Sequence, residues 1–320
     1  MSQAGRRTFL KGLLAAPGAA LAAKWTYGAT DYAAALRTFK LGAISDGFSN
    51  DVDEALKIMK GYGLQWVEIR HIWGRVYNTE ATPEQVRRIK ELLDQYGFRV
   101  SVVSTALYKC VLPGTTPTGK EKDAYPYSEQ MDLIKRAADR AHAWGTETLR
   151  GFTFWRVADP EKVADRVAEE LDKAAEVARG AGVRIAIEDE GSCNVGTGHE
   201  LARLLAKVKA PNIGANWDVG NPWVHGEVSF PSGYDVLPKN RIWHMHVKGM
   251  SCVAPGKECK NAFADQGSID LLGQFRALRR DHYTGTMSLE CEYSAPGLTH
   301  QQTSQRSMEG MLKVAEMAAA

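Results

Sequence analysis

Eight short apolar runs recur along the chain, and most of them are followed by a stretch with the apolar spacing of an amphipathic helix. The runs that predict strands lie at 39–44, 64–69, 98–104, 146–152, 183–188, 213–218, 242–248 and 286–290. The helical patterns lie at 52–62, 83–96, 128–144, 160–181, 197–207, 269–281 and 302–317. Between the sixth and seventh strands only a short turn near 234–237 is indicated. Gly97 and Gly145 after helices, and Thr82 before one, are typical stop and start signals.

Strands that alternate with helices predict right-handed crossovers and a parallel sheet. Eight such units without a break in composition favour an α/β fold with a single (β/α)8 TIM barrel over the alternative, an open doubly wound sheet. Two long connections, 105–125 and 249–267, follow the third and seventh strands. In a barrel, loops after strands lie on the catalytic face, so both are expected there.

The first 22 residues have the pattern of an export signal. Residues 5–11 read GRRTFLK, residues 12–23 are apolar and uncharged, and the run contains a small-x-small ALA triplet of the kind that a signal peptidase cuts. The paired arginines resemble a twin-arginine signal, and the simpler reading is a frayed amphipathic helix. We therefore expect a signal at 1–22, the twin-arginine export machinery as a partner, and a periplasmic or extracellular protein. The apolar run is too short to span a bilayer, so no stable membrane insertion is expected after cleavage.

Charge and cysteine content narrow the class of protein. The 320 residues include 40 Lys and Arg against 38 Asp and Glu, a formal net charge of +2. The export segment holds three of those cations and no acid, so the net charge without it is −1. A chain with this charge is unsuited to bind the phosphate backbone of a nucleic acid. The five cysteines form no CxxC pair. Cys252 and Cys259 share one loop-like stretch, where a local disulfide and two free thiols both stay open.

Four consecutive late strands end in groups that bind metal ions: Glu188, Asp218, His246 and Glu290. Side chains at strand ends on the inner face of a barrel converge on its axis, so these groups are expected to meet. Three anions in a partly buried cleft repel one another unless a cation sits between them, and this oxygen-rich set favours Mn²⁺, Mg²⁺ or Co²⁺ over structural Zn²⁺. Taken singly, an acid here is more simply a helix cap or salt-bridge partner, and His244 is assigned a core role.

In this region the chain resembles the xylose-isomerase-like TIM barrels, which include sugar and sugar-phosphate isomerases and epimerases and AP-endonuclease-type nucleases. The resemblance covers residues 38–318. Its carriers, in order, are IAIEDEG at 185–191, NWDVGNP at 216–222, HMHVKG at 244–249, GSID at 267–270 and YTGTMSLE at 283–290. It implies that Glu188, Asp218, His246 and Glu290 bind one divalent metal ion, Mn²⁺ first, with Mg²⁺, Co²⁺ or Zn²⁺ as alternatives. The family's His-x-Lys-Asp ends in Gly249 here, so any role of that Asp is lost or moved.

The resemblance further implies a metal-dependent isomerase or epimerase that acts on a ketose, a keto-sugar or a related hydroxyketone through an enediolate. Glu188 and Glu290 are the expected acid–base pair, and the neighbouring Glu190 and Glu292 compete for those positions. The expected substrate-binding residues are Glu68, Arg150, Lys248, Trp73, Trp155 and Trp223. The tryptophans are included because their rings stack on the apolar face of a sugar, although loop packing is the simpler reading of each.

Three other functions stay open. A dehydratase or lyase acting on a keto-sugar, keto-glycoside or inosose begins with the same C–H removal. A non-catalytic sugar-binding protein would not need all four ligands. An AP-endonuclease-type nuclease needs several metals and further histidines, but Asn221 stands where that branch has a His. The expected partner is a small carbohydrate and not a nucleic acid, and homo-oligomer formation is left open.

Overall fold

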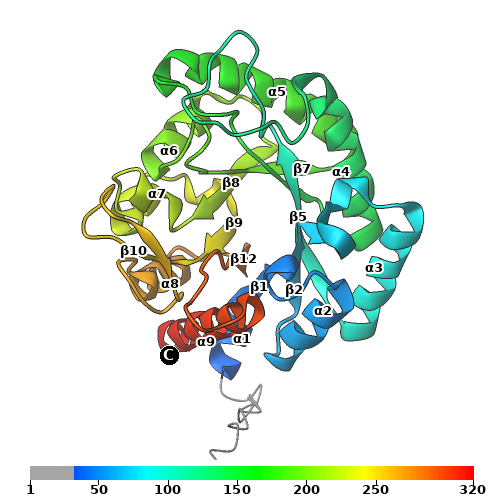
Figure 1. Cartoon of the computed structure of the whole chain (residues 1–320). Coiled ribbons are helices and arrows are strands. Elements are labelled where there is room, and N and C mark those ends of the chain that lie inside the picture. The colour runs from blue at the N-terminus through cyan, green and yellow to red at the C-terminus, as the bar shows by residue number, and fades with distance from the viewer. Residues whose placement is uncertain (1–31) are drawn as a thin grey trace, which may run out of the picture.

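The computed structural model describes residues 32–320, so the export signal predicted at 1–22 lies outside the described residues. Within them, eight parallel strands close into a barrel ringed by helices (Figure 1). The strands are β1 (Lys40–Ile44), β2 (Trp66–Ile69), β5 (Arg99–Leu107), β6 (Thr148–Gly151), β7 (Arg184–Glu188), β8 (Ile213–Asp218), β9 (Ile242–Val247) and β12 (Thr286–Leu289). β1 pairs with β12 to complete the ring. The prediction of a (β/α)8 TIM barrel is confirmed, and every predicted strand overlaps an observed one.

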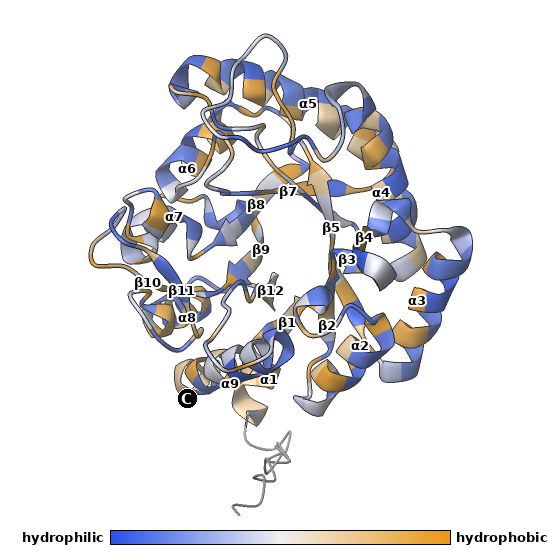
Figure 2. Cartoon of the chain, viewed as in Figure 1, coloured by the Kyte–Doolittle hydropathy of each residue, from blue (hydrophilic) through white to orange (hydrophobic). Residues whose placement is uncertain are grey.

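Amphipathic helices cover the outside of the barrel. They are α2 (Val52–Gly61), α3 (Pro83–Tyr96), α4 (Gln130–Trp144), α5 (Ala164–Gly180), α6 (Gly198–Lys207), α8 (Leu271–Arg280) and α9 (His300–Ala319). Each carries both apolar and polar residues (Figure 2), and the apolar set is buried, as Ile89, Leu92 and Leu93 are in α3. The boundary signals act as predicted: Thr82 caps α3 in a capping box, and Gly97 ends it with a left-handed φ of 70°.

Several short elements escape the sequence pattern because they are too short to show a period. They are α1 (Ala33–Thr38), α7 (Asn221–Val224), and two small hairpins, β3 (His71–Ile72) with β4 (Val76–Tyr77) and β10 (Gly249–Ser251) with β11 (Lys260–Ala262). α7 follows β8 directly, and the turn expected near 234–237 is also present, because the Leu237 N–H donates to the Tyr234 carbonyl at 3.1 Å. In the loop between β10 and β11, Cys252 and Cys259 are joined by a disulfide.

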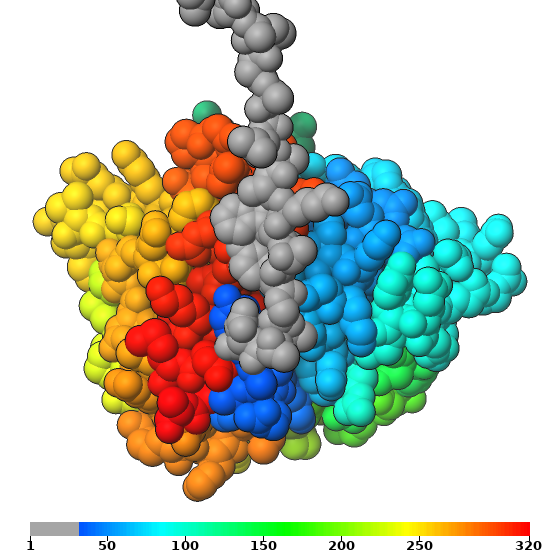
Figure 3. Space-filling view, turned by 90° about the horizontal axis from the view of Figure 1, so that it is seen from below, coloured from blue at the N-terminus to red at the C-terminus, as the bar shows by residue number. Residues whose placement is uncertain are grey.

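The first and last helices of the described chain, α1 and α9, lie side by side on the outside of the barrel. Figure 3 shows α9, in red, beside the first blue segments of the chain. The Glu316 carboxylate of α9 accepts hydrogen bonds from the N–H groups of Ala34 and Ala35, at 3.3 and 2.7 Å. A carboxylate at a helix N-terminus accepts hydrogen bonds from the free N–H groups and interacts favourably with the positive end of the helix dipole, so this contact anchors α1 to α9. Among the helices formed by residues 32–320, none is long and apolar enough to cross a membrane.

Gly42 lets β1 approach β2 closely, and replacing it with Ala is expected to destabilise the barrel by about 1–3 kcal/mol through overpacking. A Cβ at this position would stand 2.5 Å from the backbone oxygen of Trp66. Gly61→Ala at the end of α2 is the matched control, because a Cβ there meets nothing within 4 Å, and it should stabilise by about 0.5–1 kcal/mol. Urea unfolding of both variants measures the difference. Equal stability of the two would contradict the close approach.

Candidate metal centre

The four predicted ligands meet at the carboxyl end of the barrel. Glu188 ends β7, Asp218 ends β8, His246 lies on β9 and Glu290 follows β12. One ligand atom from each lies within 4.8 Å of the others, and all four residues are buried. The Nδ1 atom of His246 is 3.2 Å from Glu188 Oε1, 3.3 Å from Glu290 Oε2 and 3.7 Å from Asp218 Oδ2. The register explains the convergence, because Asp218 and His246 are direct neighbours across β8 and β9.

Three cations surround the three carboxylates. Lys248 Nζ lies 3.0 Å from Asp218 Oδ2 and 2.8 Å from Glu290 Oε2. Arg150 points to Glu188 Oε2 at 3.2 Å, and Arg70 to Glu290 Oε1 at 2.9 Å. Two of the predicted substrate-binding residues, Arg150 and Lys248, therefore contact the cluster directly. Buried charges persist only when they are paired, and these cations meet part of that requirement.

The pKa shifts report a strong negative field in the cluster. Burial opposes a charged imidazole, yet Glu68, Glu188 and Glu290 together raise the pKa of His246 well above its usual value. Burial raises the pKa of Asp218 to about 7, against the opposing effect of Lys248. Burial also acts to raise the pKa of Glu290, but Lys248 and His246 outweigh it and hold that pKa well below the usual range. The field attracts either a proton on His246 or a cation next to it.

The donor set fits a divalent cation. Buried Glu188 Oε2 and Asp218 Oδ2 accept no hydrogen bond within the described chain, although each lies beside a cationic side chain. Oxygen atoms without a hydrogen-bond donor, next to an imidazole nitrogen that can lose its proton, suit a hard metal ion. Glu188, Asp218, His246 and Glu290 would hold the ion.

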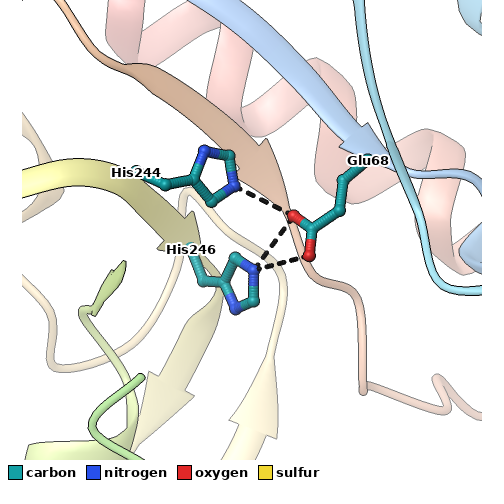
Figure 4. Close-up of side chains that lie close together, drawn as sticks. All are labelled: Glu68, His244 and His246. Carbon is teal, nitrogen blue, oxygen red and sulfur yellow. Dashed lines mark hydrogen bonds and ion pairs between the residues drawn. The ribbon is translucent and has the colours of Figure 1, made fainter. Parts of the chain in front are cut away.

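A second cluster of metal-binding types lies one layer deeper and consists of Glu68, His244 and His246 (Figure 4). Glu68 projects from β2 between the two rings, 2.9 Å from His244 Nε2 and 3.0 Å from His246 Nε2. His244 Nδ1 in turn lies 2.6 Å from Thr286 Oγ1. Glu68 is completely buried, and with both rings protonated at Nε2 it accepts a hydrogen bond from each, which satisfies this cluster without a cation. In that arrangement Glu68 orients the His246 ring and keeps Nδ1 toward the carboxylates of the four-ligand cluster.

Glu68→Gln is expected to lower the affinity of the upper cluster for metal by about 10- to 100-fold, the usual effect of removing the partner of a ligating histidine. The amide is uncharged and places an NH₂ group where Glu68 Oε1 now faces His246 Nε2 at 3.2 Å, so the hold on the His246 ring is weakened. Metal titration by calorimetry measures the change, and Thr286→Val, which acts one step further from the ring, should change affinity less. An unchanged affinity in Glu68→Gln would refute the positioning role.

Further charged groups line the mouth of the barrel above the cluster. Asp46, directly after β1, lies 2.6 Å from His71 Nδ1 and 3.2 Å from Arg70 Nε. Burial acts to raise the pKa of Asp46, but the hydrogen bond from His71 and the charge of Arg70 lower it. Across the mouth, Lys109 pairs with Glu190 at 3.3 Å. Lys248 reaches one carboxylate more, Glu292, at 3.2 Å.

Two of the three predicted tryptophans form hydrogen bonds with loop residues, and the third lines a groove. Trp155 donates its indole N–H to Asp123 in the long loop after β5, at 2.8 Å. Trp223 donates to Ser229 at 3.1 Å. Trp73 lines a groove of about 670 Å³ that also borders α2 and α3. None of the three rings has a contact with the four-ligand cluster among the described interactions, and stacking on a sugar stays a prediction for each.

Sequence reasoning gave no role to Asp46, Arg70, His71, Lys109 or Asp189. A signal was available for Arg70, because alternate residues of a strand share one face and Glu68 had already been placed inside. Asp189 carried no such signal. It directly follows Glu188, which faces the barrel interior, so the alternation along β7 places Asp189 on the opposite face. Only the fold shows that its Oδ1 accepts a hydrogen bond from the Asp218 N–H at 2.8 Å.

Comparison with known proteins gives one family and many similar folds. The family model described as xylose isomerase-like TIM barrel matches residues 56–314, and no curated protein matches the chain. The IOLI protein with a bound zinc atom shares 18% identity at a TM-score of 0.68, over 87% of this chain and 99% of that one. The probable 3-DHS dehydratase AsbF from Bacillus anthracis shares 15% sequence identity at a TM-score of 0.66, over 85% of this chain and 98% of that one. An L-ribulose 3-epimerase shares 15% identity at a TM-score of 0.63, over 88% of this chain and 95% of that one.

Proposed function

Because the chain belongs to the xylose isomerase-like TIM barrel family, which includes sugar isomerases, epimerases and dehydratases, we propose that it is a divalent-metal-dependent isomerase or epimerase of a ketose or related hydroxyketone. The observation that carries the proposal is the pair of buried carboxylates, Glu188 and Glu290. They stand 3.2 and 3.3 Å from the same nitrogen of His246. Two carboxylates that converge on one point can take a proton from a carbon and return it.

Each residue of the site has a separate role in the proposed reaction. A bound divalent ion would polarise the substrate carbonyl as a Lewis acid. Glu290, kept ionised by Lys248 and His246, removes the proton next to that carbonyl. The enediolate that forms carries negative charge, and Lys248 and Arg150 are the donors placed to meet it. Glu188, which for this step must hold a proton taken up from solvent, donates it from the other side of the cluster, and this gives an isomer or an epimer according to the carbon that receives it. The proton on Glu290 then passes to solvent.

The metal and the compartment are part of the proposal. The carboxylate-rich ligand set favours Mn²⁺, with Mg²⁺, Co²⁺ and Zn²⁺ as alternatives. The basic and apolar pattern at 1–22 supports export by the twin-arginine machinery to the periplasm or beyond. Metal analysis of the purified protein and cell fractionation with the paired arginines changed to lysine test these two points.

One observation favours the lyase alternative as the second candidate. Elimination needs an acid that protonates a leaving group, and His71 has its Nδ1 held by Asp46 at 2.6 Å. The pair is joined to the cluster through Arg70, which contacts both Asp46 and Glu290. A carboxylate that orients a histidine leaves the other ring nitrogen available for proton transfer.

Incubation in D₂O with a set of ketoses and 3-keto-glycosides tests the proposal. The metal-loaded protein should introduce deuterium at the carbon next to the carbonyl, as followed by proton NMR. An unsaturated product would assign the lyase reaction instead. No exchange with any member of the set would contradict the proposal and leave a binding role.

A further inference from the structure

The cationic side chains at the mouth of the barrel are already held by carboxylates of the same chain. Arg70 is bound by Asp46 and Glu290, and Arg150 lies against Glu188. Lys109 is bound by Glu190 at 3.3 Å, and Lys248 contacts three carboxylates within 3.2 Å. An anionic ligand would have to break one of these pairs and leave a carboxylate without its partner, which is most costly for the buried Glu188, Asp218 and Glu290.

Carboxyl groups also outnumber these cations. We call the connected set the mouth network. Its four cations are Arg70, Lys109, Arg150 and Lys248, and its eight carboxyl groups are Asp46, Glu68, Glu188, Asp189, Glu190, Asp218, Glu290 and Glu292. With a divalent ion bound, His246 is a neutral ligand and adds no charge, so the ion removes only two of the four excess negative charges. Burial and the charge of Asp218 raise the pKa of Asp189 well above its usual value, and even with that group protonated the network stays negative.

The position at which TIM barrels commonly bind phosphate is acidic here. That position lies in the loops after the last two strands. In this chain the segment after β12 begins Glu290-Cys291-Glu292, and the only basic group directly after β9 is Lys248, which these two glutamates share with Asp218.

Two ion pairs of the network remain partly open to solvent. The side chains of Lys109 and Glu190 are 26% and 24% exposed, and in the second pair Glu292 is 49% exposed but Lys248 only 5%. The first pair therefore presents a donor next to an acceptor, and the second presents the Glu292 acceptor, because Lys248 is buried against three carboxylates. A hydroxyl group both donates and accepts, so it can bind at such a pair without separating the charges.

We infer that the substrate is an uncharged polyhydroxylated compound, a free sugar or a glycoside, whose hydroxyl groups bind at the Lys109–Glu190 pair and at the exposed Glu292 carboxylate, and that sugar phosphates and sugar acids are excluded. The inference rests on the proposed function for the place where the substrate binds. Repulsion between like charges at short range in a partly buried site is the physical reason for the exclusion.

Binding is tested with ribitol and ribitol 5-phosphate on protein loaded with Mn²⁺ and freed of unbound metal. Paramagnetic relaxation of the ribitol carbons should be enhanced, and the phosphate ester should bind at least about tenfold more weakly. Equal or tighter binding of the ester, or no enhancement for ribitol, would overturn the inference. The double variant Glu190→Gln, Glu292→Gln should reduce the preference for ribitol over ribitol 5-phosphate several-fold. The control Glu91→Gln, Asp94→Asn removes two exposed charges on α3 and should leave the preference unchanged.

Turnover separates this inference from the proposed function. D-Fructose and D-ribulose are compared with their phosphate esters in D₂O. Deuterium exchange in the free sugars alone supports both the isomerase proposal and the preference for an uncharged substrate. Exchange in the phosphate esters alone supports the isomerase proposal but refutes the exclusion of sugar phosphates. Ribitol binding without exchange in any member contradicts the reaction and keeps the substrate class.

Discussion

Glu290→Gln is expected to lower the rate of deuterium exchange by about 10²- to 10⁴-fold, the usual contribution of a positioned general base. The change keeps the size of the side chain and the oxygen that faces Lys248 at 2.8 Å, but it removes the basic lone pair. Exchange is measured at saturating metal, so that a weaker hold on the ion does not contribute.

Glu292→Gln is the matched control for this variant. Glu292 lies two residues further along the same segment and contacts the same lysine, at 3.2 Å, but it is half exposed and has no contact with His246 among the described interactions. We expect it to lose less than about tenfold in exchange rate, because it does not take the proton. Similar losses in the two variants would mean that lost charge, and not lost basicity, explains the effect of Glu290→Gln.

Removal of the divalent ion by a chelator is expected to abolish exchange and to lower the thermal stability, and Mn²⁺ should restore both. The four ligands are buried, and three of them are carboxylates that repel one another without the ion. At a metal concentration 100 times the dissociation constant, binding to the folded state alone stabilises it by about 2.7 kcal/mol. Thermal unfolding with and without Mn²⁺ measures this difference.

Asp218→Asn should remove most of the metal-dependent shift in stability. Its Oδ1 accepts the N–H groups of Gly220 and Asn221, but its Oδ2 accepts no hydrogen bond in the described chain and faces Lys248, so Oδ2 is the atom available to the ion. Glu190→Gln, which changes a carboxylate outside the ligand set, should retain the shift. A shift that survives in Asp218→Asn would place the ion elsewhere, for example among Glu68, His244 and His246.

Much of the barrel was predictable because its strands and helices are periodic over whole turns. β8 was placed to the residue, and α3 began and ended where its cap signals stand. Most of the other predicted strands are one or two residues too long at an end, and β5 alone continues beyond its predicted end, to Leu107, where it pairs with Gly151 of β6. The convergence of the four strand-end groups was inferable, because in a closed parallel barrel all strands end on one face.

The second layer of the centre was not predictable in the same way. Glu68 and His244 are 176 positions apart, and their contact depends on the height at which β2 and β9 cross the barrel interior. The same holds for Arg70 and Glu290, which are 220 positions apart. A substrate-binding role was predicted for Glu68, and the structure places it beneath His246 with no exposed surface. Its position is better suited to orient the ring than to touch a sugar.

The sequence by itself determined the alternation of strands and helices and the chemical identity of the groups that end the last four strands, because both depend on residues close together in the chain. Only the tertiary structure decided which nitrogen of His246 faces the carboxylates, which cations neutralise them, and how large an excess of negative charge remains at the mouth. Those properties depend on distances of 3 to 4 Å between strands and loops far apart in sequence, and electrostatic interactions in a buried site change steeply over such distances.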